Sequence, residues 1–300
     1  MACPGIQPKL FLWLLLAASL LAACRTQPAS VASRQTFTDE IGRRVAIPPN
    51  PQRIISLAPN ITETLFALGL AERVVGVTTY CDFPVAAQTK EKVGDTLKPN
   101  LERLIALKPD LVLISTASQL EKITHQLDQL QIPVFVTNPK TVAEVLTSIR
   151  KLGEITGTTA RAEEVVAAMQ QKIADRPAAL PTPPRVLYVL QLSPLITAGK
   201  NTFINDLIQL AGGQSISGEE AADYPQFSRE TAIARAPELI IVPASHGTEL
   251  VSVDAIKTEF AVTPAVKNNR VVSVNPDLID RPGPRIVEGL EALRKAIHGN

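Results

Sequence analysis

Short apolar runs alternate with amphipathic stretches along most of the chain. The run RIISLAP at residues 53–59 has the length of a buried strand. The following NITETLFALGL places leucines at helical spacing before Gly69, with Asn60 or Thr62 as its expected cap. Similar pairs of a strand and a helix continue as far as Gly157. Strands that alternate with helices predict a parallel sheet covered by helices on both faces.

Residues 158–180 interrupt this alternation. Alanine, glutamate and glutamine are frequent there, glycine is absent, and the first proline is Pro177, so the stretch predicts one long helix. The strand and helix pattern then starts again. We therefore predict an α/β fold with two lobes, each built on a parallel sheet: an N-terminal lobe at residues 53–157, a rigid linking helix at 158–180 and a C-terminal lobe at 181–300.

One phrase occurs in both predicted lobes. LERLIALKPDLVLIS at residues 101–115 resembles SRETAIARAPELIIVPA at residues 228–244. Aligning Pro109 with Pro237 produces these pairs: Glu102 with Glu230, Ile105 with Ile233, Ala106 with Ala234, Asp110 with Glu238 and Leu111 with Leu239. The alternative is that a helix, a proline and a strand form a common local turn motif that occurs twice by chance. The matching order of the neighbouring elements favours a duplicated unit instead.

The N-terminus has the features of an export signal. Residues 1–23 carry a single charge, Lys9, and an apolar run that is too short to span a membrane. The sequence LAAC that ends at Cys24 resembles a bacterial lipobox, which implies that Cys24 is lipidated and becomes the mature N-terminus; an ordinary signal with a chance cysteine is the alternative. Residues 24–52 then predict a polar tether followed by a small hairpin around Gly42.

Charge and cysteine content narrow the class of protein. The chain has 30 basic and 29 acidic residues, and removal of Lys9 with the signal balances them. Such a chain is no candidate for binding a nucleic-acid backbone. With Cys3 in the signal and Cys24 lipidated, Cys81 has no partner for a disulfide. The apolar fraction of 45% has to provide the stability through core burial.

Catalytic and metal-binding motifs are not recognisable in the sequence. The three histidines, His125, His246 and His298, lie in different segments without metal-ligand spacing. No nucleophile elbow, phosphate loop or dinucleotide fingerprint follows a predicted strand. Residues 198–203, AGKNTF, lack the first glycine of a phosphate loop and predict a turn with a helix start.

Aromatic and charged residues instead gather in loops near predicted strand ends. Two lobes of this type form a cleft where their strands end, and ligands of α/β proteins bind there. The candidates lie in three segments: Tyr80 and Phe83 in TTYCDFP, Tyr224 and Phe227 in ADYPQFSRE, and NPDLIDRPGPR at residues 275–285. Each aromatic could equally pack in the core.

From about Arg53 to the C-terminus the chain resembles the cobalamin-type periplasmic binding proteins of ABC importers, within the larger family that captures iron-siderophores, haem and cobalamin. The resemblance is carried by ISLAPNITETLFALG, VGVTTYCDFP, NLERLIALKPDLVL, ITAGKNTFINDLIQLAGG, YPQFSRETAIARAPELIIV and DLIDRPGPRIVEGLEAL. It implies two lobes spanned by a rigid helix, a ligand held between the lobes and delivery to a membrane permease. The continuous helix at residues 158–180 by itself predicts a small opening motion and not a wide hinge.

The resemblance also assigns site residues. It implies that Tyr80 and the segment from Asp277 to Arg281 contact the ligand. The full expected ligand site is Tyr80, Tyr224, Phe227, Asp277, Leu278, Ile279, Asp280 and Arg281. For docking on the permease it implies Glu102 on one lobe and Asp280 on the other, and by this match Glu230 is not the second docking acid.

Departures from the family pattern concern the ligand. Thr96, Tyr224 and Leu278 stand where typical cobalamin binders have tryptophan, and Ala211 and Arg294 replace two cysteines that some relatives join. We expect cobalamin or a related corrinoid, with a ferric siderophore or haem as alternatives. An enzyme built on the same scaffold is the hypothesis from another class, and the lack of a predicted cleft histidine counts against it.

The expected protein is thus a non-enzymatic capture protein outside the cytoplasm. Its partners are a small-molecule ligand and the permease of an ABC importer, and it touches the membrane only through the lipid on Cys24. We expect a monomer with no cofactor, no metal site and no nucleic-acid partner. The sequence leaves open which membrane holds the anchor and which permease is used.

Overall fold

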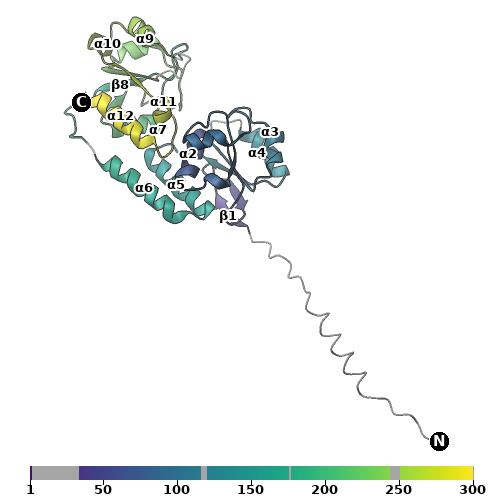
Figure 1. Ribbon diagram of the computed structural model, residues 1–300. Helices are drawn as coiled ribbons and strands as arrows, with labels where there is room; N and C mark the ends of the chain where they lie inside the picture. Colours follow the sequence, from purple (N-terminus) through teal and green to yellow (C-terminus); the bar gives the residue numbers. More distant parts are fainter. Residues whose placement is uncertain (2–33, 116–119, 176, 244–250, 300) are drawn as a thin grey trace. The chain divides into compact units, whose positions relative to one another are not determined.

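The computed structural model describes residues 1, 34–115, 120–175, 177–243 and 251–299 (Figure 1). Most of the predicted signal and tether, the predicted lipidation site Cys24 and His246 lie outside these residues. Among the helices of the described residues, none combines the length and the apolar character that crossing a membrane requires.

A small hairpin precedes the first lobe, as predicted around Gly42. Strand β1 (Gln35–Thr38) pairs antiparallel with β2 (Arg44–Ile47), and Gly42 in the turn has a φ of 86°, a conformation that favours glycine. The turn is attached to the lobe by Glu40, whose carboxylate accepts hydrogen bonds from Asn138 N and Ser148 Oγ, both at 2.5 Å. The hairpin therefore supports a segment that lines the cavity described below.

The N-terminal lobe contains a five-stranded sheet in the order β5-β4-β3-β6-β7, in which every pairing is parallel. Its strands are β3 (Ile54–Ser56), β4 (Val74–Val77), β5 (Glu91–Lys92), β6 (Leu111–Ser115) and β7 (Val134–Thr137). Its helices are α2 (Pro59–Ala67), η1 (Ala71–Arg73), η2 (Val85–Thr89), α3 (Leu101–Ala106), α4 (Leu120–Gln129) and α5 (Val142–Thr156). Helix α2 begins with Pro59 at its first turn rather than at the polar cap expected from the sequence, because proline fits where no N–H is needed.

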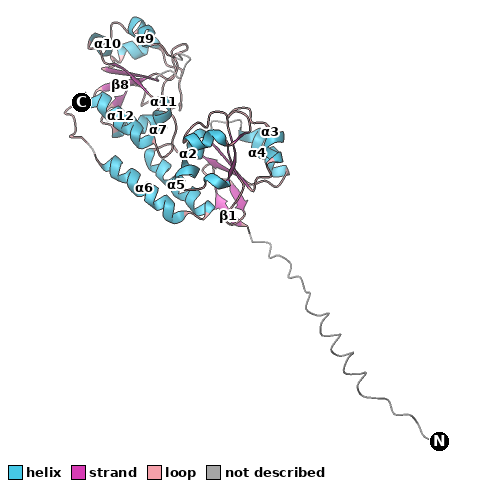
Figure 2. Ribbon diagram, viewed as in Figure 1, coloured by secondary structure: helices cyan, strands magenta, loops and turns pink. Residues whose placement is uncertain are grey.

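The C-terminal lobe repeats this plan with a four-stranded sheet in the order β11-β10-β8-β9, also parallel throughout (Figure 2). Its strands are β8 (Arg185–Tyr188), β9 (Gln214–Ser215), β10 (Leu239–Pro243) and β11 (Val271–Val274). Its helices are α7 (Phe203–Leu210), α8 (Arg229–Ala234), α9 (Val253–Glu259), α10 (Pro264–Lys267), α11 (Pro276–Ile279) and α12 (Ile286–His298). The predicted α/β fold with two separate parallel sheets is confirmed.

Successive strand residues point to opposite faces, and both faces are buried. In β6, Leu111 and Leu113 belong to one hydrophobic cluster, whereas Val112 and Ile114 belong to another. The first cluster is shared by the two lobes, because it also contains Tyr188 of β8 and residues of α5, α7 and α12. The lobes are therefore joined by a common core as well as by a helix.

The linking helix α6 (Thr159–Ala174) is fixed at both ends. Near its start, Ala162 packs against Gly153 of α5, where a Cβ would come within 2.4 Å of the Ala162 Cβ (α5 and α6 lie side by side in Figure 1). Near its end, the buried Arg294 of α12 donates hydrogen bonds to the carbonyl oxygens of Lys172 and Ile173. A cation that binds the free carbonyls of a helix C-terminus stabilises that end. Arg294 stands where the resemblance places a cysteine, so a different kind of cross-link occupies that position.

The repeated phrase has the same structural role in each lobe. In the first, the Asp110 carboxylate accepts from Gln52 N at 2.7 Å and from Arg53 N at 2.9 Å, just before β3. In the second, Glu238 accepts from Arg185 N at 3.0 Å at the start of β8. The residues before the two prolines, Lys108 and Ala236, share a φ of 47°. The acid after the proline thus attaches the turn to the first strand of its own lobe.

We expect Asp110→Ala to lower the free energy of unfolding by about 1–2 kcal/mol, because two backbone N–H groups lose a charged acceptor. Asp110→Asn keeps an acceptor oxygen and is expected to lose less. Urea unfolding followed by circular dichroism measures both. Equal stability of the alanine variant and the wild type would contradict this role.

Candidate functional site: a polar cavity between the lobes

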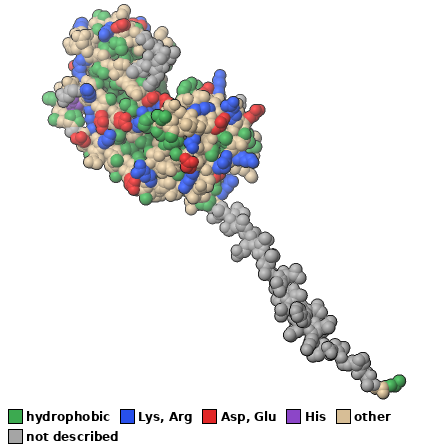
Figure 3. Space-filling model, in the orientation of Figure 1, with side chains coloured by type: hydrophobic (Ala, Val, Ile, Leu, Met, Phe, Trp, Pro, Cys, Tyr) green, Lys and Arg blue, Asp and Glu red, His purple; other side chains and the backbone are tan. Residues whose placement is uncertain are grey.

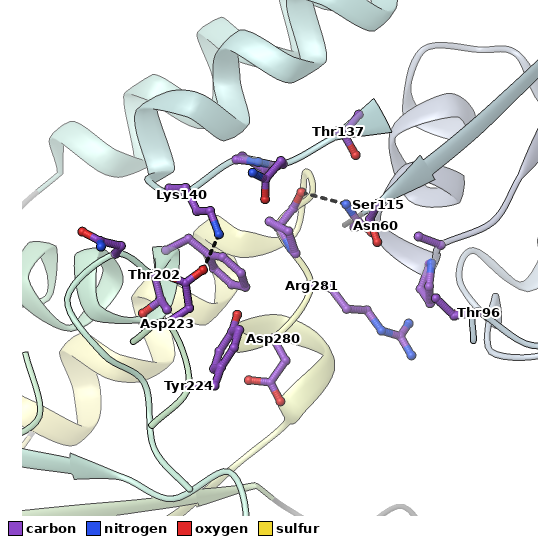
Figure 4. Close-up of a pocket in the computed structure, with 17 residues that line it drawn as sticks. Asn60, Thr96, Ser115, Thr137, Lys140, Thr202, Asp223, Tyr224, Asp280 and Arg281 are labelled. Atoms are coloured by element: carbon purple, nitrogen blue, oxygen red, sulfur yellow. Dashed lines mark hydrogen bonds and ion pairs between the residues drawn. The ribbon is translucent and has the colours of Figure 1, made fainter. Parts of the chain in front are cut away.

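A cavity of about 650 Å³ lies between the lobes, and its volume is typical of a small-molecule site. The N-terminal lobe contributes the residues that follow β3 and those at the carboxyl ends of β6 and β7, where parallel sheets bind ligands. The C-terminal lobe contributes the start of α7 and the segment after α11 (Figure 4). The lining residues are Ala58, Pro59, Asn60, Thr96, Ser115, Thr137, Asn138, Pro139, Lys140, Asn201, Thr202, Phe203, Asp223, Tyr224, Asp280, Arg281 and Pro282.

Three of the predicted ligand residues line this cavity: Tyr224, Asp280 and Arg281. Tyr224 is half exposed, and its ring lies beside Asp280 in Figure 4, whereas the Arg281 side chain extends towards Thr96 of the other lobe. These side chains come from two loops of the C-terminal lobe that are far apart in the sequence. The structure therefore brings together part of the predicted site.

The other predicted ligand residues lie elsewhere. Tyr80 is 59% exposed and does not line the cavity, and Phe227 is 7% exposed in a core cluster, where the Arg235 guanidinium lies 5.0 Å from its ring centroid. Ile279 is fully buried in the core shared by the lobes. Burial of an apolar side chain removes it from contact with a ligand. A ligand role for Phe227 or Ile279 would therefore be indirect.

Asp277 and Leu278 are also away from the cavity lining. Asp277 forms an ion pair with Arg281 at 2.7 Å, so it positions a lining residue. Leu278 is half-buried, and its carbonyl lies against Gly289, where a Cβ would come within 2.0 Å of the oxygen. The segment from Asp277 to Arg281 thus reaches the cavity only through its last two residues.

Several lining residues were missed in the sequence analysis, although a signal for some of them exists. Ser115 and Thr137 are the last residues of β6 and β7, and Asn60 is the second residue of α2, four positions after the end of β3. The rule that ligands bind at the carboxyl ends of parallel strands, applied to each predicted strand in turn, would have found these three. Lys140 and Asp223 carry no comparable signal, because they lie in loops whose meeting depends on the tertiary fold.

Both cations that line the described cavity are already neutralised. Lys140 Nζ lies 2.6 Å from Asp223 Oδ2 of the other lobe. Arg281 contacts three carboxylates: Asp82 at 2.7 Å, Asp277 at 2.7 Å and Glu63 at 3.3 Å. The hydrogen bond and charge of Arg281 keep the pKa of Asp82 below its ordinary value despite partial burial. The cavity therefore presents mainly neutral hydroxyl and amide groups to a ligand.

Asp280 is the charged lining residue without an ion pair in the described part of the chain. Its Oδ1 accepts a hydrogen bond of 2.7 Å from the hydroxyl of Tyr188. Burial raises the pKa of Asp280 to about 6, and the Tyr188 hydrogen bond opposes this rise. Burial and the charge of Asp280 also raise the pKa of Tyr224 to about 12, so its phenol is protonated at neutral pH.

A buried carboxylate joins the lobes beside the cavity. Glu63 of α2 has a side chain that is 2% exposed, and it forms two hydrogen bonds with Arg285 of the C-terminal lobe, at 2.9 and 2.7 Å. The same guanidinium lies 3.9 Å from the centroid of the Phe83 ring, a favourable cation–π distance. Next to this pair, Asn60 Nδ2 donates to the Pro282 carbonyl at 3.4 Å. We call the Glu63, Arg281 and Arg285 side chains the interlobe bracket.

Metal-binding clusters are absent from the described residues, where no group of three or more histidine, cysteine, aspartate and glutamate side chains is arranged to hold an ion. No histidine lines the described part of the cavity. The cavity is formed by two α/β lobes with a common core.

Residues 54–278 match the family model described as periplasmic binding protein, and the chain belongs to this family. It is 32% identical to YvrC of Bacillus subtilis, named as an uncharacterized ABC transporter substrate-binding lipoprotein, over 95% of both chains. It is also 32% identical to a vitamin B12-binding protein of Pectobacterium atrosepticum, over 79% of this chain and 85% of that protein.

Solved structures agree with this assignment. The periplasmic vitamin B12-binding protein BtuF of Vibrio cholerae is similar with a TM-score of 0.69 and 27% identity, covering 84% of this chain and 98% of that one. The periplasmic haem-binding protein BhuT, in complex with two haems, is similar with a TM-score of 0.74 and 26% identity, covering 82% and 98%. The family resemblance read from the sequence is therefore confirmed.

We expect Glu63→Ala to lower the free energy of unfolding by about 3–5 kcal/mol, because it leaves the half-buried Arg285 without its ion-pair partner, whereas Arg281 keeps Asp82 and Asp277. Glu164→Ala removes the same side chain from an exposed pair with Arg161 and is expected to cost less than about 1 kcal/mol. Urea unfolding of both variants tests the difference. Similar losses in the two would mean that the bracket contributes no more than a surface ion pair.

Proposed function

We propose that the protein is an extracytoplasmic substrate-binding protein that captures cobalamin or a related corrinoid in the interlobe cavity and delivers it to an ABC importer. The names of the relatives from B. subtilis and P. atrosepticum support transport and corrinoid binding. The observation that carries the proposal is the cavity itself, which both lobes line with neutral hydrogen-bonding groups.

The charges of the cavity favour a corrinoid over haem. A corrinoid has a ring edged mainly by carboxamides, which pair with hydroxyl and amide groups such as those of Asn60, Thr137 and Asn201. Haem carries two carboxylates, which require free cations. Because Lys140 and Arg281 are already paired with acids, binding of haem would have to break those ion pairs.

Haem or a ferric siderophore is the second candidate ligand. The similarity to BhuT supports it, and Tyr224 provides a phenol oxygen, a group that ligates iron in some haem proteins. We propose neither a resident cofactor nor a catalytic step, since the relatives are named for binding and transport. We further propose a monomer held to the membrane by a lipid on Cys24, which the lipoprotein name of YvrC supports.

Titration calorimetry with cyanocobalamin and with haem tests the ligand. We expect binding of cyanocobalamin, with Tyr224→Ala weakening it about ten-fold through loss of the aromatic contact. Tyr80→Ala removes the same side chain outside the cavity and is the matched control, with a smaller effect expected. Haem binding without any cyanocobalamin binding would replace the first ligand by the second, and a larger loss at Tyr80 would contradict the position of the site.

For docking on the permease we propose a different pair of acids from the one that the resemblance implied. Asp280 lines the cavity and accepts a hydrogen bond from Tyr188, so its carboxylate does not project from the surface. Glu102 and Glu230 are both exposed, and each is the second residue of its helix in the repeated unit. A Ser228 hydrogen bond lowers the pKa of Glu230 and keeps it ionised.

We expect the Glu102→Ala, Glu230→Ala double variant to bind ligand normally and to fail in uptake, because surface acids orient a complex more than they hold ligand. The matched control is Glu154→Ala, Glu164→Ala, which removes two exposed acids of α5 and α6. A transport assay with the permease in vesicles measures uptake. Normal uptake by the first variant, or an equal defect in the second, would overturn the assignment.

A further inference from the structure

The charges around the cavity are unevenly balanced, and the excess is negative. The opposite charges of Lys140 and Asp223 cancel in one ion pair. Arg281 and Arg285 contact three carboxylates, those of Glu63, Asp82 and Asp277, so this group has a net charge of one negative unit. Asp280 adds a further carboxylate, which no cation of the described residues contacts. An anionic ligand would be repelled by this arrangement, whereas a cationic one would be attracted.

Asp280 has one oxygen to offer to a ligand. Oδ1 accepts from Tyr188, whereas none of the described residues donates a hydrogen bond to Oδ2. Oδ2 is not one of the buried polar atoms without a partner among the described residues. It is therefore accessible from the cavity that Asp280 lines. A carboxylate oxygen without a donor can accept a hydrogen bond from the ligand, and this hydrogen bond is strongest when the donor group is positively charged.

Resting on the proposed function, we propose that Asp280 is a specificity-determining residue that makes the cavity select a metal complex of net positive charge over a neutral complex of the same shape. Aquacobalamin is such a cation, because its cobalt carries a water molecule, whereas cyanocobalamin is its neutral counterpart. A cationic ferric hydroxamate has the same chemistry. The cobalt-bound water of the corrinoid, or the ammonium group of the hydroxamate, donates to Oδ2 of Asp280.

Acid should weaken this selection. With a pKa of about 6, Asp280 is ionised at pH 7.5 and mostly protonated at pH 4.5. The charged or titratable groups that face it are Tyr188 of β8, Asp277 and Arg281 at α11, and Asp223 and Tyr224 of the loop before α8. Of these, the two phenols stay protonated below neutral pH, because their pKa values are raised by burial. The raised pKa of Asp280, about 6, lies between pH 4.5 and 7.5.

Calorimetric Kd values for aquacobalamin and cyanocobalamin at pH 7.0 and 4.5, in a buffer that does not coordinate cobalt, test the proposal. We expect the wild type to bind aquacobalamin at least about ten-fold more tightly at pH 7.0, with the ratio falling towards one at pH 4.5. Asp280→Asn should give a ratio near one at both pH values. The control Asp254→Asn removes a C-terminal-lobe acid that does not line the cavity and should keep the wild-type ratio.

The possible outcomes separate this inference from the proposed function. If both corrinoids bind equally, or if Asp280→Asn keeps the preference, the inference is overturned and corrinoid capture stands. If neither corrinoid binds, the proposed function fails; a preference for cationic ferrioxamine B over its neutral N-acetyl derivative would then still support selection by Asp280, and its absence would overturn the inference as well.

Two further measurements exclude a merely structural effect of the substitution. Folding raises the pKa of Asp280, so the folded state is favoured while Asp280 is protonated and disfavoured once it is ionised. The free energy of unfolding therefore falls as the pH rises through about 6. Asp280→Asn should therefore raise the Tm of the ligand-free protein at pH 7.5 and leave it nearly unchanged at pH 4. Tyr188→Phe removes the hydrogen bond that lowers the pKa of Asp280, so it should move the midpoint of the preference to higher pH. An unmoved midpoint would contradict the role of Asp280.

Discussion

A single buried carboxylate, that of Glu63, holds the two lobes in a fixed relation. It lies in the N-terminal lobe and receives three hydrogen bonds from Arg281 and Arg285 of the C-terminal lobe. Desolvating these charges is costly, and only good geometry and complete pairing offset that cost. The pairing also affects ligand binding, because Arg281 lines the cavity but its charge is neutralised by carboxylates of the protein. The bracket, the common core and the anchored ends of α6 all act against a wide hinge motion.

The duplicated unit explains why two pairs of acids occupy the same positions in both lobes. Asp110 and Glu238 each attach a turn to the first strand of its lobe, and Glu102 and Glu230 each stand at the start of the preceding helix. One set of repeated acids is therefore structural, whereas the other is exposed. Acidic and basic side chains are interspersed on the face drawn in Figure 3, in line with the balanced composition. Recognition by a partner then depends on where a few charges stand and not on a surface of one sign.

Much of the fold followed from local sequence patterns, whereas the site followed only in part. The apolar runs around Ile55 and Val112 predict strands because both faces of a parallel sheet are buried, and Gly42 predicts the hairpin turn. The burial of Phe227 and the exposure of Tyr80 could not be predicted, since an aromatic in a loop is equally compatible with a core and a ligand platform. The pairing of Lys140 with Asp223 depends on two lobes meeting, which no local pattern encodes. By contrast, the family resemblance already placed Asp280 in the expected ligand site, and the structure adds its hydrogen bond with Tyr188.

We propose that the cavity between the two lobes, held in place by the interlobe bracket, receives the ligand. The crystal structure of the mature protein with bound cyanocobalamin tests it most directly. We expect the corrin ring to lie between Tyr224 and the segment around Asn60, with the hydrogen bonds between Glu63 and Arg285 intact. A ligand bound outside this cavity, or lobes that separate so that Glu63 loses Arg285, would contradict the account.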